Sequence, residues 1–585
     1  MKKIITITLL LTCLLSSCDY LDKRDSTDGY TLEEVFGNAT NFDLYVDWMV
    51  QNPIIKYLQN GLVPFGTYDD VTDNSMSSAT FPVAGTRAAQ GDYWSMINHG
   101  WCPMCNMDTW NRAWKYVRIS NMGLKYIDMY PGDEKGRNRL MGTCYFFRAF
   151  AYFELCRRWG GMPYFTEPFT DLAANLDRER LDMRTTYLNI AEDFQKASEY
   201  LEPVIDATEW QHPTSVAALG FKSRALLYAA SEQAATEGGK TRDDIWKEAV
   251  SAASEAIASA ESNGYGLAAG SDYYSLFKGL NSDIYTKEVL FGRRAQIAWG
   301  SDAYKGTIRP PGKLSGLYGV GANQTFVDCY DMANGYPTSD PESDYNPQNP
   351  YINRGSRFEH DIMYNQKKVF GNKLMNLYNQ QEAANGNISL GGGDIKYDAG
   401  SVSAGYTRTG TYVMKWMGDQ WNTALPMVWP YIRMAELYLN YAEAAAEAGL
   451  DIKSVDSKCG YSPLQALNKI RQRAGIADLP ESYQVSGKFL ERVRNERRVE
   501  LSFEDHRLFD MRRWKIATKT DQNIYGCVIT KLAAGYDKAA YPTGFKYDYT
   551  KTIVLRRTFE NKHYLFPINR DDTYIGPLFK QNEGW

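Results

Sequence analysis

Few side chains in this sequence are spaced for catalysis. Cys102 and Cys105 form a Cys-Pro-Met-Cys motif, which has the spacing of a redox-active pair or of half a zinc site. No second ligand pair follows at zinc spacing, and no strand pattern precedes the motif, so we favour a local disulfide or two packed thiols. None of the 5 histidines pairs with another at metal-binding spacing. These residues therefore give no support to catalytic or metal chemistry.

The motifs of common enzyme classes are also absent. The sequence contains no G-x-S-x-G, no H-E-x-x-H and no P-loop. Glycoside hydrolysis needs two carboxylates about 5–10 Å apart, but a chain with 70 acidic residues always offers such a pair. We therefore predict that the protein is not an enzyme and has no cofactor. The acidic loop at residues 68–73 could hold a structural calcium ion, although such loops are more often solvated turns.

Charge and composition narrow the range of binding partners. The net charge of −5 and the pI near 5.8 argue against nucleic acid, which needs a clustered basic surface. Aromatic residues make up 14% of the chain, with 42 tyrosines and 14 tryptophans. These side chains combine a flat apolar face with a polar edge. They suit stacking on sugar rings, although many of them must belong to the core.

The first residues have the layout of a bacterial lipoprotein signal. A short basic start and an uncharged apolar run lead to Leu15-Ser16-Ser17-Cys18. The run is too short for a permanent membrane-spanning helix. We expect removal of residues 1–17 and acylation of Cys18, with residues 18–30 as a tether and residues 31–585 as one domain. A plain secretory signal with an incidental cysteine is the alternative.

Helical periodicity dominates two parts of the chain. Apolar residues recur at helical spacing between Tyr187 and Leu201, with Thr186 as the expected cap. The same period predicts helices near residues 108–130, 138–159, 215–234, 246–256, 432–446 and 491–514. Ser462-Pro463-Leu464-Gln465 is a capping-box start. Alanine-rich stripes let helices approach closely, as in tetratricopeptide-type pairs. The sequence therefore predicts a mainly α fold, with a helical scaffold at about 31–262 and 429–585.

The segment between about 263 and 428 has a different composition. Glycine, asparagine, aspartate, tyrosine and serine become frequent, and the helical period fades. A structureless stretch of this length is unusual in a compact domain unless it carries function or short strands of its own. We therefore expect a loop-rich, ligand-facing insertion that is positioned by the rigid helices.

A set of motifs follows in a fixed order along the chain. The motifs are CDYLD at 18–22, WNRAWKY at 110–116, ISN at 119–121, FFRAFAYFELCRRWGGMPY at 146–164, WPYIRMAELYLNYAEAAAEAG at 429–449, ALNKIRQRAGI at 466–476, ERVRNERRVELSFEDHRLFDMRRW at 491–514, YLFPINRDD at 564–572 and QNEGW at 581–585. This ordered set resembles the SusD/RagB family of outer-membrane lipoproteins of the Bacteroidota. The resemblance covers nearly the whole chain. The sequence departs from the family pattern at Asn569-Arg570, where the family often has a proline and other polar residues, and at Glu583, where proline is frequent.

The resemblance implies a function and a set of site residues. It implies a SusD-like fold with tetratricopeptide-like helix pairs, anchored by lipid at the outer membrane and facing the cell exterior. It implies capture of oligo- or polysaccharide and delivery to a SusC-like TonB-dependent transporter. In the family the glycan surface draws on the segment before the first signature helix and on the central insertion. Here these regions and one nearby loop supply Asp70, Tyr93, Trp94, Asn98, Trp101, Arg293, Trp299, Tyr304 and Tyr318.

A second function is also compatible with these expectations. A helical-repeat adaptor or peptide-binding lid of the transporter, with no sugar site of its own, is the alternative function.

A charged run near the C-terminal end of the sequence contains Glu496, Glu500 and Glu504. These residues are spaced like a salt-bridged helix face, so we expect the run to be structural.

Overall fold

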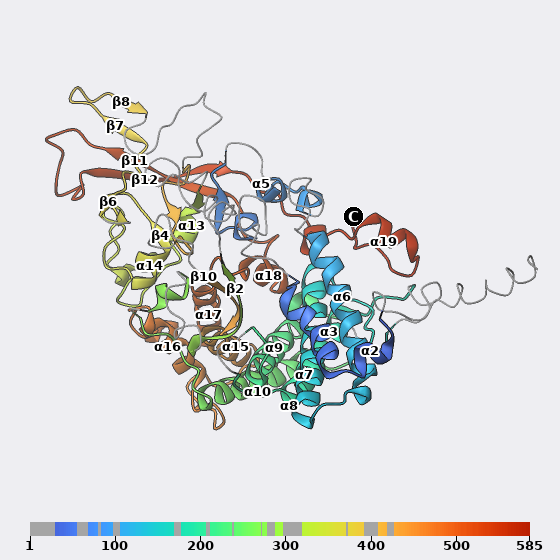
Figure 1. Ribbon diagram of the computed structural model, residues 1–585. Coiled ribbons are helices and arrows are strands. Elements are labelled where there is room, and N and C mark those ends of the chain that lie inside the picture. Colours follow the sequence, from blue (N-terminus) through green and yellow to red (C-terminus); the bar gives the residue numbers. More distant parts are fainter. Residues whose placement is uncertain are drawn as a thin grey trace, which may run out of the picture.

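The computed structural model describes most of the chain from residue 30 onward. The described residues are 30–54, 68–79, 84–96, 106–168, 177–205, 211–236, 239–270, 272–277, 287–296, 319–369, 372–390, 407–417 and 426–585. Within these ranges the protein is mainly helical, as the sequence predicted (Figure 1). No helix among them is both long enough and apolar enough to cross a bilayer.

Consecutive helices pack against one another to form the scaffold. The packed pairs are α6–α7, α7–α8, α8–α9, α9–α10, α10–α15 and α15–α16, and α15 also packs against α17. The scaffold helices are α2 (Leu32–Phe36), α3 (Ala39–Gln51), α6 (Asn106–Lys125), α7 (Glu134–Trp159), α8 (Met183–Tyr200), α9 (Ser215–Ala229), α10 (Arg242–Ser262), α15 (Met434–Glu447), α16 (Pro463–Arg473), α17 (Ser486–Glu500) and α18 (Arg507–Arg513). Further short helices in the described ranges are α5 (Ala84–Ala89), α13 (Gln324–Val327), α14 (Ser356–Asp361) and α19 (Arg570–Ile575).

Helix starts follow local capping chemistry. Ser462 and Gln465 form the predicted capping box at the start of α16. At α8 the cap is Asp182, whose side chain accepts from the backbone N–H of Thr185. The expectation that Thr186 caps this helix was wrong, because the helix begins one turn earlier and Thr186 lies inside it. A carboxylate at the N-cap also suits the positive end of the helix dipole.

Short strands fill the space beside the helices. β2 (Val289–Gln296) pairs antiparallel with β10 (Pro426–Arg433), which leads directly into α15. A four-stranded sheet has the order β12-β11-β7-β8. Its strands are β11 (Ile524–Lys531), β12 (Phe545–Leu555), β7 (Gln380–Glu382) and β8 (Ile388–Leu390), and the small pairs are β1 (Ser75–Ser77) with β3 (Val320–Ala322), β4 (Ile362–Met363) with β9 (Tyr412–Val413), and β5 (Lys368–Val369) with β6 (Lys373–Leu374).

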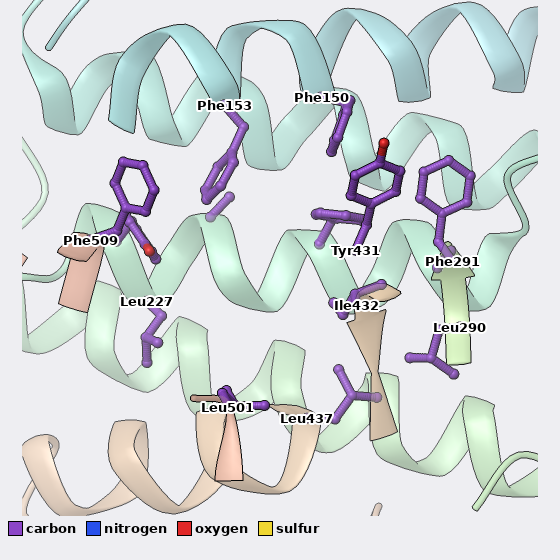
Figure 2. Close-up of a cluster of buried hydrophobic side chains, with 14 of the residues drawn as sticks. Phe150, Phe153, Leu227, Leu290, Phe291, Tyr431, Ile432, Leu437, Leu501 and Phe509 are labelled. Carbon is purple, nitrogen blue, oxygen red and sulfur yellow. The ribbon is translucent and has the colours of Figure 1, made fainter. Parts of the chain in front are cut away.

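One core joins the helices to the β2–β10 pair. Figure 2 shows Phe150 and Phe153 of α7 above α9, with Phe291 of β2 and Tyr431 of β10 beside them. Small residues allow this close packing, as the alanine-rich stripes predicted. A Cβ atom on Gly220 of α9 would lie 2.9 Å from Cδ1 of Ile432.

A buried charged network surrounds the C-terminal end of α17. The Glu500 carboxylate accepts hydrogen bonds from Arg357 at 2.5 Å and from Arg433 at 2.7 Å, and it also pairs with Arg473. Lys415 bonds to Glu504 at 2.7 Å. The charged run is thus structural, as expected, but its main partners come from distant segments.

The run is also not one continuous helix. Helix α17 ends at Glu500, and α18 begins at Arg507. Between them, Phe503 and Asp505 have φ angles of 59° and 63°. Left-handed backbone interrupts a right-handed helix, so the expectation of a single helix at 491–514 was wrong.

Candidate functional site

The predicted site residue Trp94 lies in an aromatic cluster that also contains residues of the C-terminal segment. Trp94 belongs to η2 (Tyr93–Met96), a 3₁₀ turn that follows α5, and its ring is half-buried. Trp585, the last residue, meets it edge-on, with 6.1 Å between ring centroids and an interplanar angle of 83°. We call the group of Tyr93, Trp94, His563, Phe566 and Trp585 the Trp94 cluster.

Tyr93 forms the floor of the Trp94 cluster. Its ring is 1% exposed and stacks on the imidazole of His563, with centroids 4.6 Å apart. Phe566 and Trp585 lie within 6.3 Å of the same ring. Tyr93 therefore supports the neighbouring tryptophans and presents no face to solvent in this structure.

Two basic side chains flank the exposed rim. The Arg570 guanidinium lies 5.9 Å from the Trp94 ring centre, and the Lys562 ammonium lies 5.3 Å from that of Trp585. Cations at these distances are attracted to the ring faces. Trp585 is held in place because its indole N–H donates to the backbone carbonyls of Lys562 and Leu565. Trp94 has no equivalent hydrogen bond among the described residues.

Burial lowers the pKa values of two titratable groups beneath the rings. It lowers the pKa of His563 to about 4, with some opposition from Glu560. Nδ1 of His563 accepts from the backbone N–H of Glu560 at 2.9 Å, so the neutral ring carries its proton on Nε2. Burial also lowers the pKa of Arg512 to about 10; its guanidinium stacks 4.2 Å from the centre of Phe566. The floor of the cluster therefore holds one neutral imidazole and one buried cation at neutral pH.

The signature segment at residues 146–164 positions the C-terminus. The backbone N–H of Phe566 donates to the carbonyl of Arg158 at 2.8 Å, just before α7 ends. Asn582 donates to the carbonyls of Trp159 and Phe566. Gly161 lets the chain pass Leu181, because a Cβ atom there would lie 1.9 Å from the carbonyl oxygen of that residue. This docking places Trp585 beside Trp94.

The other predicted site residues do not belong to the Trp94 cluster or lie outside the described residues. Asp70 is 1% exposed, and its Oδ1 accepts from the Ser75 hydroxyl at 2.6 Å. Arg293 of β2 is half-buried and lines a small apolar cavity of about 20 Å³ with Tyr116 and Tyr431. No hydrogen bond, ion pair or ring contact in the described part of the chain joins Arg293 to the Trp94 cluster. Asn98, Trp101, Trp299, Tyr304 and Tyr318 lie outside the described residues, as do Cys18, Cys102 and Cys105.

The acidic loop proposed for calcium uses its carboxylates internally. Asp69 bonds to Asn74, and both oxygens of Asp73 accept from Arg507 at 2.8 Å. Within the described ranges, no three acidic, histidine or cysteine residues group in a way that could hold a metal ion.

Sequence reasoning missed the part of the Trp94 cluster that comes from the C-terminal segment. Trp585 and Arg570 appeared only within motifs that resemble a family, with no role attached, and His563 lies just before one of these motifs. A tryptophan as the last residue was the available signal. Its partner lies at the other end of the chain, so no local pattern could connect the two.

Comparison with known families agrees with this geometry. The model of the SusD family matches residues 287–585, and a second one, described as starch-binding associating with outer membrane, matches residues 19–227. The chain therefore belongs to the SusD family. Among curated relatives, SusD-like protein P2 of Formosa agariphila is 26% identical over 218 residues, which are 36% of this chain and 39% of that protein. SusD-like protein P38 of the same organism is 24% identical over 25% of this chain and 28% of its own length. The matches thus span well under half of either relative.

Solved structures confirm the tetratricopeptide-like, SusD-like fold. A SusD-like protein from Bacteroides fragilis is 24% identical with a TM-score of 0.71, and covers 95% of this chain and 99% of its own. A SusD-like carbohydrate-binding protein from the same species is 20% identical with a TM-score of 0.68, covering 94% and 100%. A SusD homolog from Bacteroides thetaiotaomicron is 20% identical with a TM-score of 0.60, covering 95% and 98%.

Proposed function

We propose that the protein is a surface glycan-binding lipoprotein that captures oligo- or polysaccharide and passes it to a SusC-like TonB-dependent transporter. Membership of the SusD family supports this proposal, together with the description of the model that matches residues 19–227. The structural observation that carries it is the pair Trp94 and Trp585 at the rim of an aromatic cluster. In this proposal the protein has no catalytic role.

The chemistry of the rim suits sugar rings. The C–H face of a pyranose packs on an indole, and hydroxyl groups exchange hydrogen bonds with nearby polar side chains. Arg570 and Lys562 supply donors beside the two rings. Such a shallow surface buries few atoms, so each contact is weak. Many lipid-anchored copies binding one polymer would raise the overall affinity.

The proposed anchor is Cys18, acylated after removal of residues 1–17. Several acyl chains hold a protein firmly at a bilayer, whereas one chain holds weakly. The tether at 18–30 is short, which keeps the body close to an embedded transporter. Trp101, Trp299, Tyr304 and Tyr318 remain proposed members of the same glycan surface.

Native affinity gels cast with a panel of polysaccharides test this function. We expect at least one neutral or acidic glycan to retard the protein. Trp94→Ala should weaken this retention about tenfold or more, because truncating a central tryptophan commonly costs about 2 kcal/mol. Trp48→Ala is the matched control, since Trp48 is also half-buried but packs with Lys115 on α3 and α6.

The gels separate three outcomes. Retention that Trp94→Ala leaves unchanged would contradict the site while leaving the function intact. No retention on any glycan, with binding to a peptide pool, would favour the adaptor interpretation. Equal loss in both tryptophan variants would indicate a general effect on folding, and thermal melting of the variants identifies that case.

A further inference from the structure

A second, polar pocket lies within the helical scaffold, and no residue of the Trp94 cluster lines it. It has a volume of about 190 Å³ and lies where η4 (Glu232–Ala234), α10, α15 and α17 approach the segment after α18. In Figure 1, α10, α15 and α17 lie together below the centre, and α10–α15 and α15–α17 are packed pairs. The residues that matter here are Glu232, Arg242, Trp246, Glu447, Arg494 and Lys519, which we call the α10–α17 pocket.

The charges that line the α10–α17 pocket leave one cation uncompensated. Arg242 pairs with Glu232 at 2.7 Å, and Arg494 pairs with Glu447 at 2.6 Å. Lys519 is exposed at the rim, and no carboxylate of the described chain lies within ion-pair distance of it. An occupant with one negative charge would therefore neutralise the remaining positive charge of Lys519.

One N–H group of the lining lacks an acceptor that an occupant could supply. Trp246 is 3% exposed, and its indole N–H has no hydrogen-bond partner among the described residues. This N–H is not among the fully buried groups, so it is open to an occupant of the pocket. The Arg494 guanidinium is fixed over the Trp514 ring at 4.8 Å, and its Nε is fully buried, so an occupant can reach only the outer edge of this group. An acceptor oxygen on an occupant would satisfy the Trp246 N–H.

The carboxylates add a second requirement. Glu232 and Glu447 each accept from one arginine, and their carboxylates keep further lone pairs free for hydroxyl donors. An inorganic anion offers acceptors only, and a neutral sugar offers no charge. A molecule with one carboxylate and several hydroxyl groups offers both, and a volume of about 190 Å³ suits a single ring better than a larger ligand.

We propose that the α10–α17 pocket binds a hydroxylated carboxylic acid of the size of a hexuronate. The carboxylate faces Lys519 and the outer edge of the Arg494 guanidinium. Ring oxygens accept from the Trp246 indole, and hydroxyl groups donate to Glu232 and Glu447. This site is separate from the glycan surface of the proposed function and does not depend on it.

Equilibrium dialysis of the full soluble chain against labelled glucuronate tests the proposal. A ligand of this size should bind with a Kd of about 1 mM, while glucose and inorganic phosphate should bind at least about tenfold more weakly. Trp246→Phe keeps a ring but removes the N–H, and should weaken glucuronate about tenfold. Lys519→Gln should weaken it about fivefold. Lys538→Gln, an exposed lysine of the β11–β12 hairpin, is the control and should change nothing.

Each alternative outcome is decisive. Equal binding of glucose or phosphate would contradict the proposed chemistry, as would glucuronate binding that Lys519→Gln leaves unchanged. Loss of glucuronate binding in Trp94→Ala would place the ligand at the other site and contradict this one. A galacturonate trimer distinguishes a free acid from a chain end, and its binding supports the proposal only if Lys519→Gln weakens it. Because Lys519 is exposed, that variant should fold even if Trp246→Phe does not.

Discussion

Asp69 shows how burial sets the charge of a single side chain. Its Oδ1 accepts from the Asn74 amide at 2.7 Å, while its buried Oδ2 has no hydrogen-bond partner among the described residues. Burial raises the pKa of Asp69 to about 7, although the hydrogen bond from Asn74 opposes the shift. The carboxyl is therefore protonated below neutral pH in the folded protein.

This shift predicts a pH-dependent difference between the wild type and Asp69→Asn. The folded protein holds a proton that the unfolded chain has lost between pH 4 and 7, so the wild type loses about 1.4 kcal/mol of unfolding free energy per pH unit over that window. The amide of the variant cannot ionise. The free energy of unfolding of the variant should therefore rise relative to that of the wild type as pH rises from 4.5 to 7. Above pH 7 the difference should be constant. Urea midpoints at pH 5 and pH 7.5 measure it, and a difference that does not change with pH would contradict the assignment.

Glu500 is the most heavily paired carboxylate of the buried network. Burial alone would raise its pKa, but Arg473, Arg433 and Arg357 hold the pKa of Glu500 well below its usual value. Glu500→Gln would leave these buried cations undercompensated, so we expect a loss of about 3–5 kcal/mol in unfolding free energy. The control is Glu491→Gln, an exposed residue on the same helix, which should change stability by less than about 0.5 kcal/mol. Similar losses for the two variants in denaturant titrations would refute a structural role for the network.

At the scale of elements, the sequence predicted what local periodicity encodes. The centres of α7 to α10 follow from apolar residues at helical spacing, and the start of α16 follows from its capping box. The boundaries were less accurate. Residues 426–433 form a strand that pairs with β2, and this pairing depends on a segment more than a hundred residues earlier. The break after Glu500 depends on left-handed residues that no periodic pattern marks.

The turn after α7 is the element on which the C-terminal docking depends. A Cβ atom on Gly161 would lie 1.9 Å from a backbone oxygen, which cannot rotate away. Gly161→Ala should therefore displace residues 180–182 and loosen the hydrogen bond from Arg180 to Asn582, which is 2.8 Å long. We expect the free energy of unfolding to fall by more than about 3 kcal/mol, and we expect faster proteolysis of the last residues. Gly487→Ala in α17, where an added Cβ meets nothing within 4 Å, is the control; if both variants melt alike, this account of the turn is wrong.

At the scale of the whole molecule, the fold joins segments from opposite ends of the chain. Trp94 meets Trp585, and Asp73 bonds to Arg507. The resemblance of ordered motifs predicted the fold and the region that contains Trp94. It could not predict that Tyr93 and Asp70 are buried, because burial depends on which distant residues cover a loop. The division into a scaffold and a ligand-facing insertion stays a prediction.

Anchoring is the prediction that concerns the intact molecule in its cell. Wild-type protein should incorporate labelled palmitate and sediment with membranes, because several acyl chains bind a bilayer firmly. Cys18→Ala should incorporate no label and appear in the soluble fraction. Export to the cell exterior should make the wild type accessible to protease added to intact cells. Label retained in Cys18→Ala would show that another residue carries the lipid.

The most direct test of the glycan surface is a crystal structure with an oligosaccharide prepared from the polysaccharide that retards the protein most. We predict a sugar ring stacked on Trp94, with hydroxyl groups near Arg570 and Lys562. A sugar bound elsewhere, with the rim of the Trp94 cluster free of ligand, would contradict the central claim.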